Sequence, residues 1–308
     1  MRSIPVAILA GSDREVAPPP AEQRDLHPLA SFKAARVLAR GRPLIHELVA
    51  RLGAARGFGP IVVAGPARVY EPLGLDAELL DTDGTVGSNL RRAIEHHQAG
   101  ANGPLAILAC DVLPTSGELG ELRERYERES RSALWLPLVK APDDPAELGP
   151  FAWKPTYLLR PAPDAEPVRV LPGHLAIFHP EMLRLELLYQ LVDLAYRTRN
   201  RSIAYKRSVM VSSILGSLLW NDFVELLHLS APTRTATVLT SGLRLARRLT
   251  ATELSIPELE HLLGRIFLRT DRTLPGGLRT PVVECLALAE DVDMEEEARD
   301  FEGHLRQG

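Results

Sequence analysis

The first half of the chain alternates short apolar runs with segments in which apolar residues recur every three or four positions. Such runs, at residues 4–10, 60–65 and 105–109, are typical of buried strands. The intervening periodicity predicts helices over residues 43–52 and 89–97. Strands that alternate with helices form βαβ units, which stack into a mostly parallel sheet. We therefore expect an α/β fold, a three-layer doubly wound sheet whose ligands bind at the carboxyl ends of the strands.

The second half departs from this pattern. Residues 143–172 are rich in proline and irregular, although residues 156–159 fit an edge strand. Near the end, the apolar run 282–289 predicts a further strand, and the charged segment 295–305 predicts a closing helix.

Between these segments, the spacing of apolar residues is helical from about residue 180 to residue 263. We expect helices over residues 182–196, 209–229 and 239–249. The chain therefore divides into an α/β core, residues 1–180 and 264–308, and a helical subdomain or insertion, residues 181–263.

The expected helix over residues 209–229 has an apolar face wider than one helix normally buries against a single partner. The core domain, a second subunit or a lipid-type acceptor would each cover it. We favour a homodimer through this block, because basic side chains at residues 197–207 precede the face and a polar rim is usual at an interface. The face consists of Ile214, Leu215, Leu218, Leu219, Trp220, Phe223, Leu226 and Leu227.

Composition and charge narrow the class of protein. The chain has 308 residues, 45% of them hydrophobic and 25% charged, which is ordinary for a globular protein with a sizeable core. Its formal net charge of -4 gives no basic field that would draw the protein onto nucleic acid or anionic lipid. Any site for a polyanion must therefore be local.

The cysteines and the apolar segments bear on location. Cys110 and Cys285 lie far apart in sequence, which fits a reducing compartment. The apolar start at residues 1–10 is too short for a signal peptide. The longest uncharged stretch, residues 208–221, is shorter than the roughly 20 residues of a transmembrane helix. We therefore expect a cytoplasmic protein without a transmembrane segment.

The apolar run 105–109 ends at Cys110 and Asp111, just before a loop that contains proline. A carboxylate at the end of a buried strand is a suitable ligand for Mg²⁺, which prefers one or two carboxylates together with substrate phosphates. The alternative is that Asp111 caps the next turn.

A second acidic group follows the last apolar run, where Asp293 directly precedes the predicted closing helix. Taken alone, Asp293 fits a helix N-cap, followed by acidic residues that the helix dipole favours. If both apolar runs are strands of one parallel sheet, however, Asp111 and Asp293 meet at the same edge. Such a pair is what a phosphate-bound Mg²⁺ requires.

The turn after the first strand offers small residues, whose backbone N–H groups approach a phosphate closely. Lys33 is more informative, because the chain contains only four lysines. A flexible ammonium near a glycine turn suits a triphosphate, and a solvated surface position is the alternative. The turn residues are Leu9, Ala10, Gly11, Ser12 and Arg14.

Six short motifs follow one another along the chain. They are Leu9-Ala10-Gly11, Lys33 with Gly41-Arg42-Pro43, Gly87-Ser88-Asn89 opening a helix, Cys110-Asp111-Val112-Leu113-Pro114, Gly173-His174 through Pro180-Glu181, and Asp291-Val292-Asp293. Their order resembles that of the GT-A-fold nucleotidyltransferases, in particular the MobA-like NTP transferases. The resemblance covers about the first 180 residues and the last 30.

This resemblance implies a GT-A nucleotidyltransferase-like core and roles for the matching residues. These are Leu9, Ala10, Gly11, Ser12, Arg14 and Lys33 for the triphosphate, Gly87, Ser88 and Asn89 near the base, and Asp111 and Asp293 for Mg²⁺. The loop after the first strand departs from the family's Gly-rich pattern, since it has fewer glycines and an additional acid. It reads Gly11-Ser12-Asp13-Arg14-Glu15.

The expected reaction joins a nucleoside triphosphate and a small phosphorylated acceptor, with Mg²⁺ as cofactor and Lys33 and Asp111 as catalytic residues. A nucleotide-sugar glycosyltransferase of the same fold would want an Asp-X-Asp motif, of which Asp111-Val112-Leu113 has only the first carboxylate. A non-catalytic nucleotide-binding or scaffold protein is the alternative from another class. His174 and His179 share neither a helix face nor a strand face, and we interpret them as structural.

We predict that light scattering at micromolar concentration gives the mass of a dimer, because a second copy then covers the apolar face of residues 209–229. A monomer whose mass does not depend on detergent would contradict the dimer and favour packing within one chain.

Overall fold

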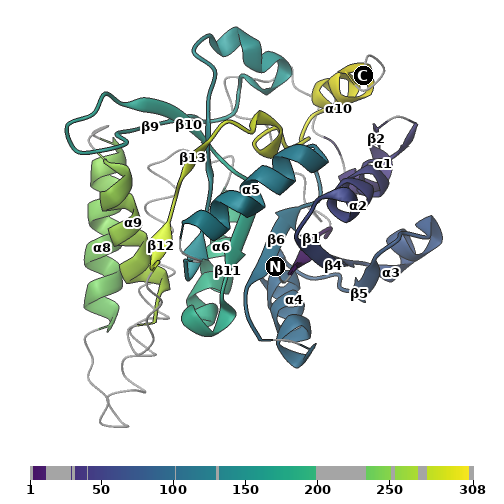
Figure 1. Ribbon diagram of the computed structural model, residues 1–308, viewed down its shortest axis with the longest axis horizontal. Helices are drawn as coiled ribbons and strands as arrows, with labels where there is room; N and C mark the ends of the chain where they lie inside the picture. Colours follow the sequence, from purple (N-terminus) through teal and green to yellow (C-terminus); the bar gives the residue numbers. More distant parts are fainter. Residues whose placement is uncertain are drawn as a thin grey trace.

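The computed structural model describes residues 3–11, 29, 32–39, 41–100, 102–129, 132–198, 234–250, 254–269 and 276–304 (Figure 1). A seven-stranded sheet forms its centre. In spatial order the strands are β12 (Leu278–Arg279), β7 (Leu134–Trp135), β11 (Leu175–Phe178), β6 (Leu105–Ala109), β1 (Ile4–Leu9), β4 (Phe58–Gly65) and β5 (Glu78–Asp81). The sheet is mostly parallel, and β11 runs antiparallel to both of its neighbours.

Helices cover both faces of this sheet, because successive side chains of a strand point to opposite sides. In β1, Val6 and Ile8 belong to the core cluster that includes α2 (Leu44–Ala54) and α5 (Ser116–Arg128). Ala7 belongs to the opposite cluster, which includes α4 (Val86–Gly100) and α6 (Leu185–Thr198). The expected three-layer, doubly wound α/β fold is confirmed.

The elements predicted from periodicity in the first half are present with small shifts at their ends. Strands β1, β4 and β6 and helices α2 and α4 occupy the expected segments, and β6 has the predicted bounds. Short elements complete this part of the chain. They are α1 (Lys33–Arg36), β2 (Leu38–Ala39), β3 (Arg42–Pro43), α3 (Ala67–Tyr70) and η1 (Glu71–Leu73).

A second, four-stranded sheet lies beside the first (Figure 1). Its strands in order are β13 (Val282–Val283), β8 (Leu138–Lys140), β10 (Val168–Pro172) and β9 (Tyr157–Leu159). The edge strand expected over residues 156–159 is thus present as β9. Val170 and Leu159 pack against Leu259 and Leu262 of α9 (Ile256–Phe267), so this sheet has a core of its own.

The prediction of a strand over residues 282–289 is mostly wrong. Only β13 is extended, and residues Leu286–Leu288 form the 3-10 turn η4. Moreover, β13 pairs with β8 in the second sheet rather than joining the main sheet. The apolar character of the run reflects burial of side chains such as Cys285 and Leu288 in the core that contains α5, and burial alone does not specify a strand.

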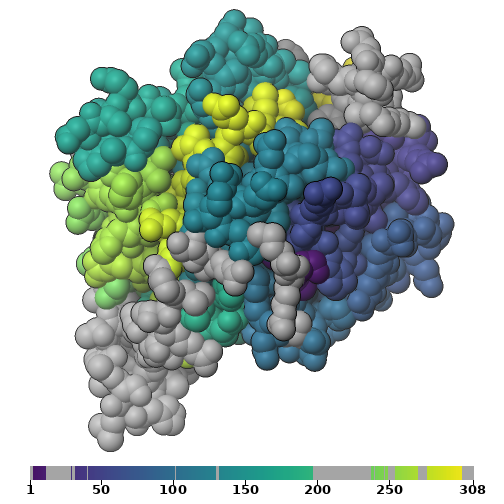
Figure 2. Space-filling model, in the orientation of Figure 1, coloured from purple at the N-terminus to yellow at the C-terminus, as the bar shows by residue number. Residues whose placement is uncertain are grey.

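The C-terminal segment runs across the molecule rather than ending at one side. From β12 and β13 it passes α5 and reaches α10 (Glu295–His304), and the yellow atoms in Figure 2 follow the first part of this course over the surface. Helix α10 contacts β2 and the 3-10 helix η2 (Pro145–Phe151). Helix α10 therefore lies beside a strand from the first 40 residues of the chain.

The helices expected over residues 182–196 and 239–249 are present as α6 and α8 (Arg234–Thr250), and the 3-10 turn η3 (Pro180–Met182) precedes α6. Helix α6 packs on α4. Between these two helices, the two terminal guanidinium nitrogens of Arg91 donate to the carboxylate oxygens of Glu186 at 2.7 and 2.6 Å. Helix α8 packs on α9. The expected helix over residues 209–229 lies outside the described residues. Among the helices that are described, none is both long enough and apolar enough to cross a membrane.

Candidate active site

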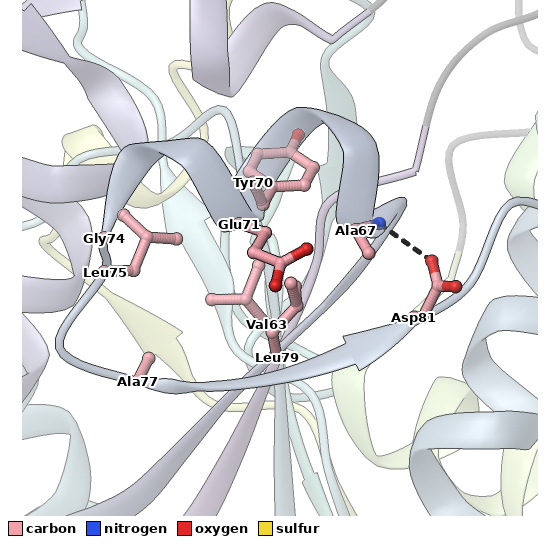
Figure 3. A pocket seen from close by; sticks show the side chains of 9 residues that line it. All are labelled: Val63, Ala67, Tyr70, Glu71, Gly74, Leu75, Ala77, Leu79 and Asp81. Atoms are coloured by element: carbon pink, nitrogen blue, oxygen red, sulfur yellow. Dashed lines mark hydrogen bonds between the residues drawn. The ribbon is translucent and has the colours of Figure 1, made fainter.

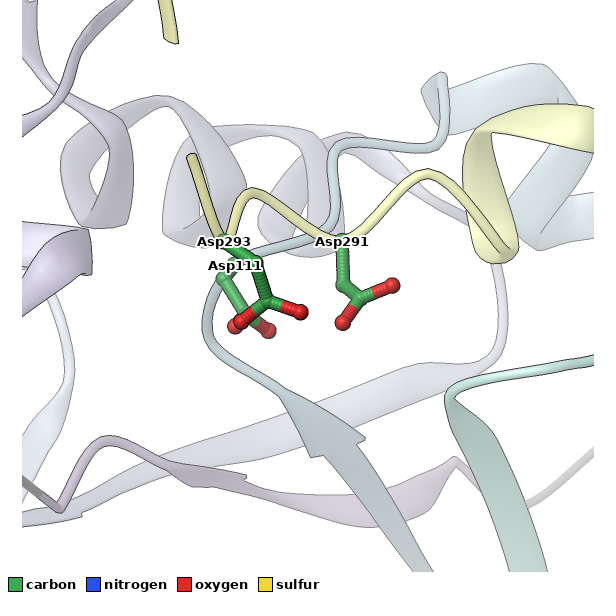
Figure 4. Close-up of side chains that lie close together, drawn as sticks. All are labelled: Asp111, Asp291 and Asp293. Atoms are coloured by element: carbon green, nitrogen blue, oxygen red, sulfur yellow. The ribbon is translucent and has the colours of Figure 1, made fainter. Parts of the chain in front are cut away.

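Three carboxylates meet at the carboxyl edge of the main sheet (Figure 4). Asp111 follows β6, while Asp291 and Asp293 lie between η4 and α10. One oxygen of each lies within 4.8 Å of the others. The backbone N–H of Val292 donates to the carbonyl oxygen of Asp111 at 3.0 Å, which joins the two segments. Asp111 and Asp293 thus converge, although the final apolar run does not belong to the main sheet.

Lys33 brings a positive charge to these acids from the other end of the chain. Its Nζ forms an ion pair with Asp293 and lies 3.7 Å from Oδ2 of Asp111. The preceding residue, Phe32, has a φ of 60°, a left-handed conformation at the start of α1. The N–H of Leu29 donates to the carbonyl oxygen of Asp293 at 2.9 Å, so the approach to α1 is tied to the acidic segment.

Lys154 is a second lysine in the cluster, and it was not among the site residues predicted from the sequence. Its Nζ lies 2.5 Å from Oδ1 of Asp291 and also donates to the carbonyl oxygen of that residue. It is 3.7 Å from Asp293, and it lies 5.5 and 5.3 Å from the ring centroids of Phe151 and Trp153. A signal was available, since Lys154 is the one lysine in a proline-rich segment.

His174 also faces the acids. It precedes β11, and its Nε2 lies 3.3 Å from Oδ1 of Asp291. His179, which the sequence analysis grouped with it, is elsewhere and lies 3.2 Å from Glu181 and 3.4 Å from the hydroxyl of Tyr126.

Glu297 holds the acidic segment in place from the first turn of α10. Its side chain has 0% exposure, and its two oxygens accept three hydrogen bonds. Oε2 accepts from the backbone N–H groups of Asp293 at 2.5 Å and Met294 at 2.9 Å, and Oε1 accepts from the indole N–H of Trp153 at 2.8 Å. Glu297 thus binds the free backbone N–H groups before the helix, while the carboxylate of Asp293 pairs with Lys33.

Burial and mutual repulsion act on the acids, and the lysines oppose both. Burial raises the pKa of Asp111, an effect that Lys33 opposes and that Asp291 and Asp293 strengthen. Burial also raises the pKa of Glu297, to about 7, against the influence of Lys154. For Asp291, burial is outweighed by His174 and Lys154, which hold its pKa well below the ordinary range.

Burial acts on the pKa of the two cationic partners in the opposite direction. Burial alone would lower the pKa of Lys154, but Asp291, Glu297 and Asp293 raise it above its ordinary value. Burial likewise opposes the charged form of His174, and Asp291 raises its pKa overall. The site is therefore a compact set of opposite charges, in which each buried carboxylate has a cation close by.

Gly11 and Asn89, both predicted to bind the nucleotide, lie against each other at the same edge of the sheet. A Cβ on Gly11 would come within 2.5 Å of Nδ2 of Asn89, so a larger residue here would displace the Asn89 side chain. The side chain of Asn89 accepts from the N–H of Gly84 at 3.0 Å and donates to its carbonyl oxygen at 3.3 Å. Leu9 ends β1, and the N–H of the buried Ala10 donates to Ala64 at 2.8 Å.

Gly87 and Ser88 make contacts within the protein. The N–H of Gly87 donates to Asp193 of α6 at 2.7 Å, and a Cβ there would lie 2.5 Å from the carbonyl oxygen of Tyr189. The hydroxyl of Ser88 donates to the carbonyl oxygen of Thr85 at 2.9 Å. Ser12 and Arg14, the remaining predicted site residues, lie outside the described residues.

A separate pocket lies between α3, η1 and strands β4 and β5 (Figure 3). Its walls are largely aliphatic, with Val63, Leu75 and Leu79 among them. Two carboxylates, those of Glu71 and Asp81, also line it, and Asp81 accepts a hydrogen bond from the N–H of Ala67 at 2.8 Å. The lining residues include no cation, in contrast to the carboxylate cluster at the other site.

The chain is similar to known proteins in fold alone. No family model matches the chain, and no curated protein matches it in sequence. A hypothetical transferase structure from Thermus thermophilus is 23% identical, with a TM-score of 0.56, and the match covers 97% of this chain and 100% of that one. The two proteins share a fold.

Two further structures are more distant. The 2-C-methyl-D-erythritol 4-phosphate cytidylyltransferase, also from Thermus thermophilus, is 15% identical, with a TM-score of 0.43, over 99% of this chain and 100% of that one. CMP:2-keto-3-deoxy-manno-octonic acid synthetase, in complex with CTP, is 13% identical, with a TM-score of 0.42, over 62% of this chain and 78% of that one.

We predict that Glu297→Gln lowers the free energy of unfolding by about 2 kcal/mol, because an amide nitrogen must replace one acceptor oxygen that now receives N–H donors in a buried place. Urea unfolding followed by circular dichroism measures this change. Glu295→Gln is the matched control, since Glu295 lies in the same helical turn but is half exposed and pairs with Arg299. Equal stability of Glu297→Gln and wild type would contradict the positioning role.

Proposed function

We propose that the protein is a Mg²⁺-dependent nucleotidyltransferase of the MobA-like kind, which transfers a nucleoside monophosphate from a nucleoside triphosphate to a small phosphorylated acceptor. The observation that carries this proposal is the meeting of Asp111, Asp293 and Lys33 at the carboxyl edge of a doubly wound sheet. Open α/β sheets bind their ligands at this edge.

The donor set fits a magnesium ion. Carboxylate oxygens are the hard ligands that Mg²⁺ prefers, and ligands about 2.1 Å from an ion lie up to roughly 4.2 Å apart. The three carboxylates offer oxygens within 4.8 Å of one another. The ammonium of Lys33 between Asp111 and Asp293 is itself a stand-in cation. Asp111 and Asp293 would therefore hold the ion, while Asp291 pairs with Lys154 and His174.

When bound, Mg²⁺ would supply charge neutralisation at the phosphates and a template for in-line displacement. The protein's own residues would provide binding and orientation. Lys33 would hold the β- and γ-phosphates by its ammonium group. Gly11, which ends the described part of the β1 loop, has no Cβ and would let the backbone approach the nucleotide closely.

The proposed reaction needs little covalent work from the protein. A phosphate oxygen of the acceptor attacks the α-phosphorus, a new P–O bond forms, and the bond between the α-phosphorus and the oxygen bridging to the β-phosphorus breaks. That bridging oxygen leaves with pyrophosphate. No proton has to be removed, because the attacking oxygen is already anionic.

A pyrophosphate-release assay with each nucleoside triphosphate and a panel of phosphorylated acceptors tests this function directly. Release that depends on both Mg²⁺ and an acceptor supports it. Two other classes give different results. A nucleotide-sugar glycosyltransferase releases no pyrophosphate but consumes a nucleotide sugar, and a nucleotide-binding scaffold shows a thermal shift with a triphosphate without any turnover.

We predict that Asp111→Asn and Asp293→Asn each reduce Mg²⁺-dependent turnover by roughly a hundredfold or more, because each removes a charged ligand with little change of volume. Steady-state pyrophosphate release measures the effect. Asp76→Asn, at an exposed position before β5, is the matched control for loss of one carboxylate. Unchanged Mg²⁺ dependence in both site variants would remove the basis for the metal assignment.

We predict that Lys33→Ala weakens triphosphate binding by about tenfold or more but changes monophosphate binding little, because the lost contact is a charge-assisted bond to the β- and γ-phosphates. Calorimetric titration with the two forms of the same nucleotide compares them. Equal losses for both nucleotides would place Lys33 elsewhere.

A further inference from the structure

We infer that Lys33 occupies the cation position between Asp111 and Asp293 when no nucleotide is bound, so that a divalent ion enters the site only together with a triphosphate. This inference rests on the proposed function but goes beyond it, since it assigns Lys33 a role before any substrate is present. It also states the order in which charge enters the site.

The ammonium group of Lys33 lies between the two carboxylates that are the proposed ligands. Lys33 Nζ forms an ion pair with Asp293 and lies 3.7 Å from Asp111, so it bridges the two carboxylates that would hold the ion. The side chain of Lys33 is 9% exposed, and water therefore screens its charge poorly. An ion bound by the same two carboxylates would lie next to this ammonium and be repelled by it.

The charge of the surrounding groups is the second step. Four carboxylates, those of Asp111, Asp291, Asp293 and Glu297, face Lys33, Lys154 and His174. The cations already compensate most of the negative charge that would attract an ion. A bare divalent ion therefore gains little from entering unless one cation leaves.

Lys33, rather than Lys154, is the cation that leaves. Lys154 binds the main-chain oxygen and the carboxylate of Asp291, and it lies over the Phe151 and Trp153 rings. Lys154 is thus held on several sides, by Asp291 and by the two aromatic rings. The ion pairs of Lys33 run to the two proposed ligands themselves, and an ammonium on a flexible stem turns readily.

A triphosphate allows Lys33 to exchange the two carboxylates for other anionic partners. Its β- and γ-phosphate oxygens offer Lys33 new anionic partners, and this releases the carboxylates of Asp111 and Asp293 for the ion. Nucleotide and ion consequently strengthen each other's binding, and linkage requires the effect to be equal in both directions. The free protein, in contrast, discriminates against the bare ion.

Mn²⁺, which is detected by electron paramagnetic resonance, tests this without any turnover. Free Mn²⁺ is titrated with nucleotide-free wild type, Lys33→Met, Lys33→Arg and Lys140→Met. Lys140 is the matched control, because it is a half-exposed lysine that pairs with Glu284 away from the acids, and its replacement changes the net charge equally. Circular dichroism and urea unfolding verify that each variant is folded.

We expect Lys33→Met to bind Mn²⁺ roughly tenfold or more tightly than wild type in the absence of nucleotide, because a buried repulsive charge is removed. Lys33→Arg and Lys140→Met are expected to match wild type. Adding a non-hydrolysable triphosphate is expected to tighten Mn²⁺ binding in wild type by about tenfold or more, and to have a smaller effect in Lys33→Met.

The outcomes separate this inference from the proposed function. If Lys33→Met binds Mn²⁺ no more tightly than wild type and Lys140→Met, the placeholder role is wrong, whatever the enzyme catalyses. If Lys33→Met gains affinity but no nucleoside triphosphate tightens Mn²⁺ binding in wild type, Lys33 does occupy the cation position, but its exchange with a triphosphate and the proposed nucleotidyltransferase function are both wrong.

Discussion

The pairing of partly buried carboxylates with lysine ammonium groups is the interaction on which the rest of the site depends. Lys33 comes from the first helix, Asp111 from the end of a central strand, and Asp293 from the segment before the last helix. Buried carboxylates so close together are costly unless cations compensate them. The sheet brings these segments to one edge, and the ion pairs between them hold the three segments together there.

Much of the fold was predictable because its elements carry their own period. The strand at residues 105–109 and helix α2 each have a local pattern that survives without knowledge of the tertiary structure. The second sheet was not predictable in this way. Its strand β13 has two residues, too few for a period, and it pairs with β8 from a distant part of the chain. The apolar run over residues 282–289 was predicted to be a longer strand because burial, rather than a period, gives it its apolar character.

The residues of the site likewise divide into those that the sequence predicts and those that only the fold brings together. Asp111 and Asp293 stand out in the sequence because each follows an apolar run, and Lys33 stands out because lysines are rare in this chain. Lys154, His174 and Glu297 join the cluster through contacts that only the folded chain creates. For Glu297 the available signal was its position four residues after Asp293, at a helix start, where a carboxylate reaches back to free N–H groups.

The ion pair between Lys33 and Asp293 spans 260 residues of sequence. Contacts of such separation form late, because the intervening chain must first be ordered to bring their ends together. Strand β12 of the main sheet also comes from the C-terminal segment, so this segment completes the sheet as well as the site. Lys33 and Asp111 gain their acidic partner only when residues 291–297 dock at the same edge, and the chemistry that the site supports therefore depends on this docking.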